Sequence, residues 1–166
     1  MAEDEAHAWD DSTGEELDPN MVQPARMEEM DKVFKHEVCT KVPIKDCWDA
    51  AGKKPVAVRW LDINKGDSVH PEYRSRLVAK DFKDSKREDL FAATPPLEAL
   101  KYLIHLWMTD GVGWSSKSHR VKMDFIDVRR AYFHAEAIRD LFVDLPPEDA
   151  TPGMCGKLNK SMYGTR

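Results

Sequence analysis

The chain has 166 residues, of which 42% are hydrophobic and 33% charged, so it supports one domain of ordinary size or one lobe of a larger enzyme. No run approaches the roughly 18–20 apolar residues that a membrane-spanning helix needs. The N-terminus Met-Ala-Glu-Asp-Glu is acidic and lacks the basic-then-apolar pattern of a secretory signal. We therefore expect an intracellular protein, cytoplasmic or nuclear, with no signal peptide and no membrane partner.

Charge is distributed unevenly along the chain. Residues 1–31 hold eleven carboxylates against the single Arg26, a net charge of −10, which leaves +5 for the remainder of a chain whose total is −5. An acidic segment without hydrophobic periodicity is typical of disorder. The sequence therefore predicts a disordered acidic leader over 1–31 and a mildly basic folded body over 32–166, compatible with nucleic acid without requiring it.

The first half of the body contains a predicted helix and a predicted hairpin. Apolar residues recur at helical spacing over 26–37, and a loop is expected from Pro43 to Pro55. Residues 56–63 and 73–80 are rich in β-branched and aromatic side chains and are separated by a polar stretch with Gly66. That pattern predicts a β-hairpin with a long tip.

The second half mixes both kinds of element. Thr94 can cap a helix with Pro95-Pro96 in its first turn, an apolar face from Leu97 to Trp107 and an end at Gly111. Beyond a polar connection, the remaining expected elements are a strand over 121–128, a short helix or turn over 130–137, a strand over 141–145 and an unfinished element over 158–163. Mixed helices and hairpin-like strands without a βαβ repeat define an α+β fold.

Cysteine and histidine give no clear site. Cys39, Cys47 and Cys155 fit neither a disulfide framework nor a paired zinc site, and reduced thiols are expected. His134 lies close to Asp127 in the sequence, but a surface or core histidine is the simpler interpretation than a ligand.

Asp127 is the residue with the clearest chemical potential, because it ends an apolar run and precedes Tyr132 and Phe133. One interpretation is a helix cap, the commonest role of aspartate at such a position. The other is a metal ligand, since hard Mg²⁺ prefers oxygen donors. Asp124 is a poor partner for it, because side chains three residues apart in a strand point to opposite faces.

Six segments in order resemble the reverse transcriptases of copia-type LTR retrotransposons. Any one of them is a weak signal, but the ordered set is specific. The segments are Lys54-Pro-Val-Ala-Val-Arg-Trp60, Arg74-Ser-Arg-Leu-Val-Ala-Lys80, Phe91-Ala-Ala-Thr-Pro-Pro-Leu-Glu98, Asp127-Val-Arg-Arg-Ala-Tyr-Phe-His134, Leu141-Phe-Val-Asp-Leu-Pro146 and Lys157-Leu-Asn-Lys-Ser-Met-Tyr-Gly164. The resemblance implies a partial reverse-transcriptase fold, with fingers over about 54–96 and a front palm over about 97–166.

The resemblance also assigns roles to individual residues. Asp127 would be the catalytic acid that holds Mg²⁺, with the Val128 carbonyl as a further ligand, and Tyr132 would be the steric gate that rejects a 2′-hydroxyl. Arg130 and Ala131 would offer backbone N–H groups to the triphosphate. The basic residues of the fingers hairpin would close over that triphosphate, although each is also compatible with a solvated strand face; they are Lys65, Arg74, Arg76 and Lys80.

The same resemblance implies two Mg²⁺ ions as cofactors, and an RNA template, a DNA primer and a dNTP as partners of the full-length protein. The family's second acid motif, Tyr-x-Asp-Asp, does not occur in the 166 residues. We therefore expect a fragment that lacks the C-terminal palm and thumb and is inactive as a polymerase alone. The alternative is a non-catalytic remnant or co-opted fragment that binds nucleic acid through its basic body.

Overall fold

The computed structural model describes residues 7–81, 95–116 and 119–165. Its mixture of helices and short antiparallel strands confirms the α+β class. The chain divides into two compact units, Met1–Lys83 with Arg130–Arg166, and Asp84–Arg129, and each is described by itself. Within the described ranges, no helix combines the length and apolar character needed to cross a bilayer.

The predicted hairpin is confirmed. Strands β4 (Val58–Asn64) and β5 (Tyr73–Ala79) pair antiparallel, with Val58 opposite Ala79 and Asn64 opposite Tyr73. At its tip, the Asn64 Oδ1 accepts hydrogen bonds from the backbone N–H groups of Gly66 (3.0 Å) and Glu72 (2.9 Å). Asparagine thereby replaces a backbone acceptor in the turn, which fixes the start of the long connection.

A second sheet contains three antiparallel strands in the order β3-β9-β8, with bounds Cys39–Pro43, Met154–Leu158 and Phe142–Val143. Adjacent side chains of β8 point to opposite faces. Phe142 packs against Cys47 and Cys155 beside helix α2 (Ile44–Ala51), whereas Val143 joins the main core. The prediction of a loop through Pro43–Pro55 is therefore wrong for 44–51, where Ile44, Cys47 and Ala51 recur at helical spacing and face this small cluster.

Helix α1 (Pro19–Lys35) begins well before the predicted 26–37 helix. Asp18 caps it by accepting the Asn20 N–H at 2.9 Å, and Pro19 occupies the first helical position, where no N–H is needed. Residues 7–17 add the two-residue strands β1 (Ala8–Trp9) and β2 (Glu16–Leu17), which pair antiparallel.

The expectation of a disordered leader is consequently corrected for residues 7–31. Three of its apolar side chains, Ala8, Leu17 and Val22, form a buried cluster against Tyr73 of β5. Asp10 accepts the Asn64 N–H at 2.7 Å, so even the acidic positions bond to the hairpin. Composition alone misses these contacts because each is made with residues about 50 positions away in the chain.

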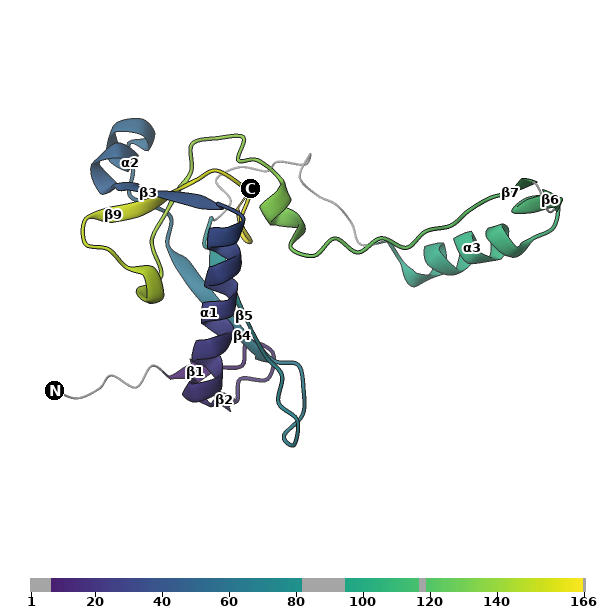
Figure 1. Ribbon diagram of the computed structural model, residues 1–166, viewed down its shortest axis with the longest axis horizontal. Helices are drawn as coiled ribbons and strands as arrows, with labels where there is room; N and C mark the ends of the chain where they lie inside the picture. The colour runs from purple at the N-terminus through teal and green to yellow at the C-terminus, as the bar shows by residue number, and fades with distance from the viewer. Residues whose placement is uncertain (1–6, 82–94, 117–118, 166) are drawn as a thin grey trace. The chain divides into compact units, whose positions relative to one another are not determined.

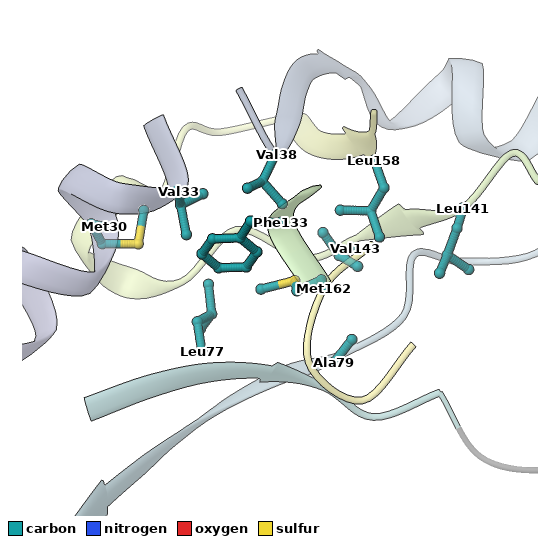
Figure 2. Packing of buried hydrophobic residues seen from close by; sticks show 10 residues of the cluster. All are labelled: Met30, Val33, Val38, Leu77, Ala79, Phe133, Leu141, Val143, Leu158 and Met162. Carbon is teal, nitrogen blue, oxygen red and sulfur yellow. The ribbon is translucent and has the colours of Figure 1, made fainter. Parts of the chain in front are cut away.

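One main core joins most of these elements (Figure 2). The ring of Phe133 is fully buried and lies among side chains from α1, β5 and the C-terminal segment (Figure 2). The ten buried members are Met30, Val33, Val38, Leu77, Ala79, Phe133, Leu141, Val143, Leu158 and Met162. In Figure 1, α1 runs along the β4–β5 hairpin, so this core binds the N-terminal helix to the body.

The second unit carries helix α3 (Leu97–Met108) and a small hairpin of β6 (Trp114–Ser116) and β7 (His119–Arg120). The expected helix is confirmed, but its first turn follows Pro96, and the proposed Thr94 cap lies outside the described residues. No residue of α3 is buried; Leu97 and Leu103 are 58% and 54% exposed. Its predicted apolar face is thus open to solvent within this unit.

Two predictions near the palm motifs are wrong. Residues 121–128 are irregular and not a strand, although Val121, Phe125 and Val128 follow an apolar pattern; all three are more than half exposed. A strand needs a hydrogen-bonded neighbour, and no described strand pairs with this segment. The expected element over 158–163 is also absent, because β9 ends at Leu158 and only an isolated bridge follows, between Glu136 and Lys160.

The expected turn over 130–137 is a short 3-10 helix, η2 (Ala131–His134), and a second one, η3, covers Pro147–Asp149. The expected strand over 141–145 is confirmed in its central part as β8. η2 matters most for the site, because it carries Tyr132 on its outside and Phe133 in the core.

Candidate nucleotide-binding site

Strand β5 separates its basic and apolar residues by alternation. Ser75, Leu77 and Ala79 are buried, whereas Arg74 and Arg76 are exposed, and Lys80 is exposed just beyond the strand. Successive side chains of a strand point to opposite faces, so the cations line one face of the hairpin. The Ala57 carbonyl accepts the Lys80 N–H at 2.8 Å, which prolongs the pairing to this point.

A C-terminal turn brings Tyr163 onto this face. The Tyr163 carbonyl accepts the Ala79 N–H at 2.8 Å. Gly164 follows with φ +80°, and a Cβ at its position would lie 2.1 Å from the Ala79 carbonyl oxygen, so only glycine permits this approach. The guanidinium of Arg76 then lies 5.3 Å from the Tyr163 ring centroid, within cation–π range.

η2 places two predicted residues beside Tyr163. Phe133 anchors η2 in the core, and the Tyr132 ring centroid lies 5.1 Å from that of Tyr163 at an interplanar angle of 57°. Arg130 precedes η2 in the left-handed region (φ 53°, ψ 46°), a conformation that disfavours residues with a Cβ. Its carbonyl accepts the Phe133 N–H at 2.9 Å, so core packing and the short helix together hold it there.

We call Arg76, Arg130, Tyr132 and Tyr163 the arginine–tyrosine cluster. Burial raises the pKa of the Tyr163 hydroxyl, and the nearby Glu29 carboxylate adds to the rise, while Arg76 and Arg130 oppose it. The cluster therefore combines two cations with two aromatic rings, one of them half exposed at Tyr132. Such a surface suits a ligand that has both an anionic part and a flat or sugar-like part.

Glu29 of α1 supplies an acid to this basic surface. Its side chain is buried, and Oε2 lies 3.5 Å from the Arg130 Nε. Burial raises the pKa of the Glu29 carboxyl above its usual 4.5, against the opposing effect of Arg130 and, more weakly, Arg76. Sequence reasoning missed Glu29, since its position in the acidic leader offered no signal of contact with the body.

The predicted metal ligands are not part of the arginine–tyrosine cluster. Asp127 and Val128 belong to the second unit, where both are exposed in the irregular stretch 121–128. Across the part of the chain that the structure describes, no group of three His, Cys, Asp or Glu residues could hold a metal ion. One carboxylate does not by itself make a divalent-metal site, so Asp127 and Val128 could supply only part of the ligand set that the resemblance implied.

The structure thus brings together Arg76, Arg130 and Tyr132, with Ala131 at the exposed start of η2 between the last two. Arg74 makes a long ion pair with Glu72, at 3.9 Å, toward the hairpin tip, and Lys65 lies at that tip. The sequence motif assigned no separate role to Tyr163. In the structure its ring lies beside those of Tyr132 and Phe133, so it helps to position η2 at this site.

Comparison with known protein families matches residues 47–166 to the model described as Reverse transcriptase (RNA-dependent DNA polymerase). The match covers well over half of the chain, which therefore belongs to the reverse transcriptase family. No curated protein and no solved structure is significantly similar to the chain. The family implies nucleic-acid template and primer as partners and a general dependence on divalent metal. α1 and β3 lie before the matched residues, yet they pack on β5 and pair with β9.

Proposed function

We propose that residues 54–166 are the fingers and front palm of a copia-type reverse transcriptase, and that the arginine–tyrosine cluster receives the incoming nucleotide. The observation that carries the proposal is the convergence of Arg76, from the hairpin, with Tyr132, from η2, around Tyr163. These residues are far apart in sequence and all fall within the family match. Their convergence supports a shared ligand over a set of unrelated surface residues.

In this proposal each residue has a distinct part. Arg76 attracts the triphosphate, with Arg74, Lys80 and Lys65 adding positive charge along the same hairpin. The backbone N–H groups of Arg130 and Ala131 contact the phosphates. Tyr132, half exposed and tilted against the Tyr163 ring, lies under the sugar and excludes a 2′-hydroxyl.

Asp127 and the Val128 carbonyl would each provide one oxygen ligand to Mg²⁺. A two-metal transfer needs carboxylates that hold both ions, and the 166 residues contain no Tyr-x-Asp-Asp motif. We propose that this stretch of chain binds substrate but does not complete the catalytic centre. A primer-extension assay with the 166-residue chain, template, dNTPs and Mg²⁺ should show no incorporation; robust incorporation would overturn this part of the proposal.

Binding to an RNA–DNA hybrid tests the basic face separately. Affinity should fall with salt, and Arg76→Ala should weaken it and reduce the slope of log K against log salt by about one. Lys45→Ala, which removes an exposed cation on α2, is the matched control and should leave the slope unchanged. Asp127→Ala should also bind normally. If Arg76→Ala behaves like Lys45→Ala, the assignment of Arg76 is wrong.

A second candidate is a remnant or co-opted fragment that binds nucleic acid without chemistry. The exposed cations along one face of β5 favour it, since phosphate contacts need no metal. Both candidates predict hybrid binding. They differ at Tyr132, because only the polymerase proposal requires discrimination between deoxyribose and ribose.

A further inference from the structure

Glu29 points a buried acid at the most basic part of the candidate site. Glu29 is only 4% exposed, and its Oε2 lies 3.5 Å from the Arg130 Nε. Among the described residues, no donor hydrogen-bonds its Oε1, which is fully buried. A buried carboxylate with one loose contact and one unsatisfied oxygen is an unfavourable arrangement unless it serves another purpose.

The ion pair with Glu29 engages few of the hydrogen-bond donors of Arg130. A guanidinium offers five N–H donors, yet its further ion pair within the described ranges is a 3.9 Å contact from Nη2 to the exposed Glu28. Arg76 also acts on Glu29 electrostatically from the hairpin side. A ligand with several anionic oxygens would satisfy both arginines more fully than one carboxylate does.

Glu29 is nevertheless held in place from outside the family-matched residues. It lies on α1, ahead of residue 47, and three residues before it Arg26 fastens the helix to the body. The Arg26 Nη2 contacts Asp62 Oδ2 at 2.6 Å, and its Nη1 contacts Glu148 Oε1 at 3.4 Å. The Glu148 Oε2 in turn accepts the Trp60 Nε1–H at 2.9 Å. The docking of α1 therefore fixes the Glu29 carboxylate beside the arginine–tyrosine cluster.

We propose that Glu29 is a built-in competitor: its carboxylate occupies the anion position between Arg130 and Arg76, and a polyphosphate ligand must displace it to bind. The identity of that ligand as a dNTP rests on the proposed function; the competition itself does not. α1 thereby lowers the affinity of the arginine–tyrosine cluster for phosphate chains, and release of Glu29 raises it.

Isothermal titration of the whole 166-residue chain with inorganic tripolyphosphate tests the competition. At about pH 8, Glu29→Gln should bind about tenfold more tightly than the wild type. Glu28→Gln, which removes the exposed neighbouring charge, should change affinity by less than about twofold. Adding Arg130→Gln to Glu29→Gln should abolish the gain. Equal affinities of wild type and Glu29→Gln, or an equal gain in Glu28→Gln, would overturn the proposal.

The wild-type chain gives a second readout if Glu29→Gln does not fold. The ¹³C signal of the Glu29 carboxyl should shift in step with tripolyphosphate saturation, because the ligand takes Arg130 from it. An unchanged Glu29 signal at saturation, or no tripolyphosphate binding at all, contradicts competition. Tripolyphosphate carries no sugar, so failure here is distinct from failure of the polymerase proposal, which would appear as equal binding of ribo- and deoxyribonucleotides.

Discussion

Arg26 and Asp62 form a buried ion pair that joins α1 to strand β4. The Arg26 Nη2 lies 2.6 Å from the Asp62 Oδ2, and the two side chains are 14% and 6% exposed. Asp62 Oδ1 also accepts the Ser75 hydroxyl at 2.6 Å, and Arg26 lies over the Trp60 ring at 5.4 Å. Arg26, the single arginine of residues 1–31, thus attaches this acidic segment to the hairpin.

Arg26→Ala should lower the free energy of unfolding by about 3–5 kcal/mol, because it leaves Asp62 charged and buried without its main partner. Chemical denaturation followed by circular dichroism measures this loss. Arg59→Ala is the matched control: Arg59 pairs with Asp11 at 3.1 Å, with side chains 49% and 42% exposed, and its loss should be about 0.5 kcal/mol. Similar small losses in both variants would mean that α1 is not docked as described.

Phe133→Ala should destabilise the chain by about 3–5 kcal/mol, since it empties a fully buried position at the centre of the main core. Its neighbour Tyr132 is 49% exposed, and Tyr132→Ala should cost about 1 kcal/mol through the lost contact with Tyr163. Thermal unfolding of the two variants compares them directly. A larger effect of Tyr132→Ala than of Phe133→Ala would contradict the placement of η2.

Stability should also depend on the ionisation of Glu29. Its pKa is raised by burial, so the folded state binds a proton more tightly than the unfolded state does. The stabilisation is complete below the usual value of 4.5, and it is lost as the pH rises through the raised pKa. As pH rises, the unfolding free energy of Glu29→Gln should therefore increase relative to that of the wild type.

Asp10 provides the opposite dependence as a control. The Asn64 N–H, followed by the Ser12 hydroxyl and backbone N–H, holds the pKa of Asp10 well below its usual 3.8. Its stabilising effect is present above pH 3.8 and is lost on acidification. Asp10→Asn should therefore reduce the loss of unfolding free energy on acidification. It should leave unchanged the gain in stability that Glu29→Gln shows over the wild type as pH rises. If Glu29→Gln tracks the wild type across the pH range, the described burial of Glu29 is wrong.

Local patterns predicted the elements whose stability is local. The β4–β5 hairpin followed from β-branched residues on both sides of a turn segment, and α3 followed from leucines at helical spacing. Helix α2 carried a comparable signal in Ile44, Cys47 and Ala51 that a short, charged sequence obscured. For these elements the residues that decide the structure are neighbours in the chain.

Elements that depend on distant partners were predicted poorly. Residues 121–128 have a strand's apolar pattern but no described pairing strand, and the chain remains irregular there. Residues 7–31 have the composition of a disordered leader, yet Arg26 and Asp10 bind the hairpin. In the site, Arg76 and Tyr132 were predicted from motifs, whereas Glu29 was invisible because its partner Arg130 lies 101 residues away.

The central claim, that the arginine–tyrosine cluster receives a deoxynucleotide, is tested most directly by comparing dUTP with UTP, which differ only in the 2′-hydroxyl. Equilibrium titration of the 166-residue chain should give about tenfold tighter binding of dUTP, equivalent to about 1.4 kcal/mol. Tyr132→Ala should bring the two affinities within about twofold, and Arg76→Ala should weaken both equally. Equal binding of dUTP and UTP to the wild type, with no response to Tyr132→Ala, would contradict the account.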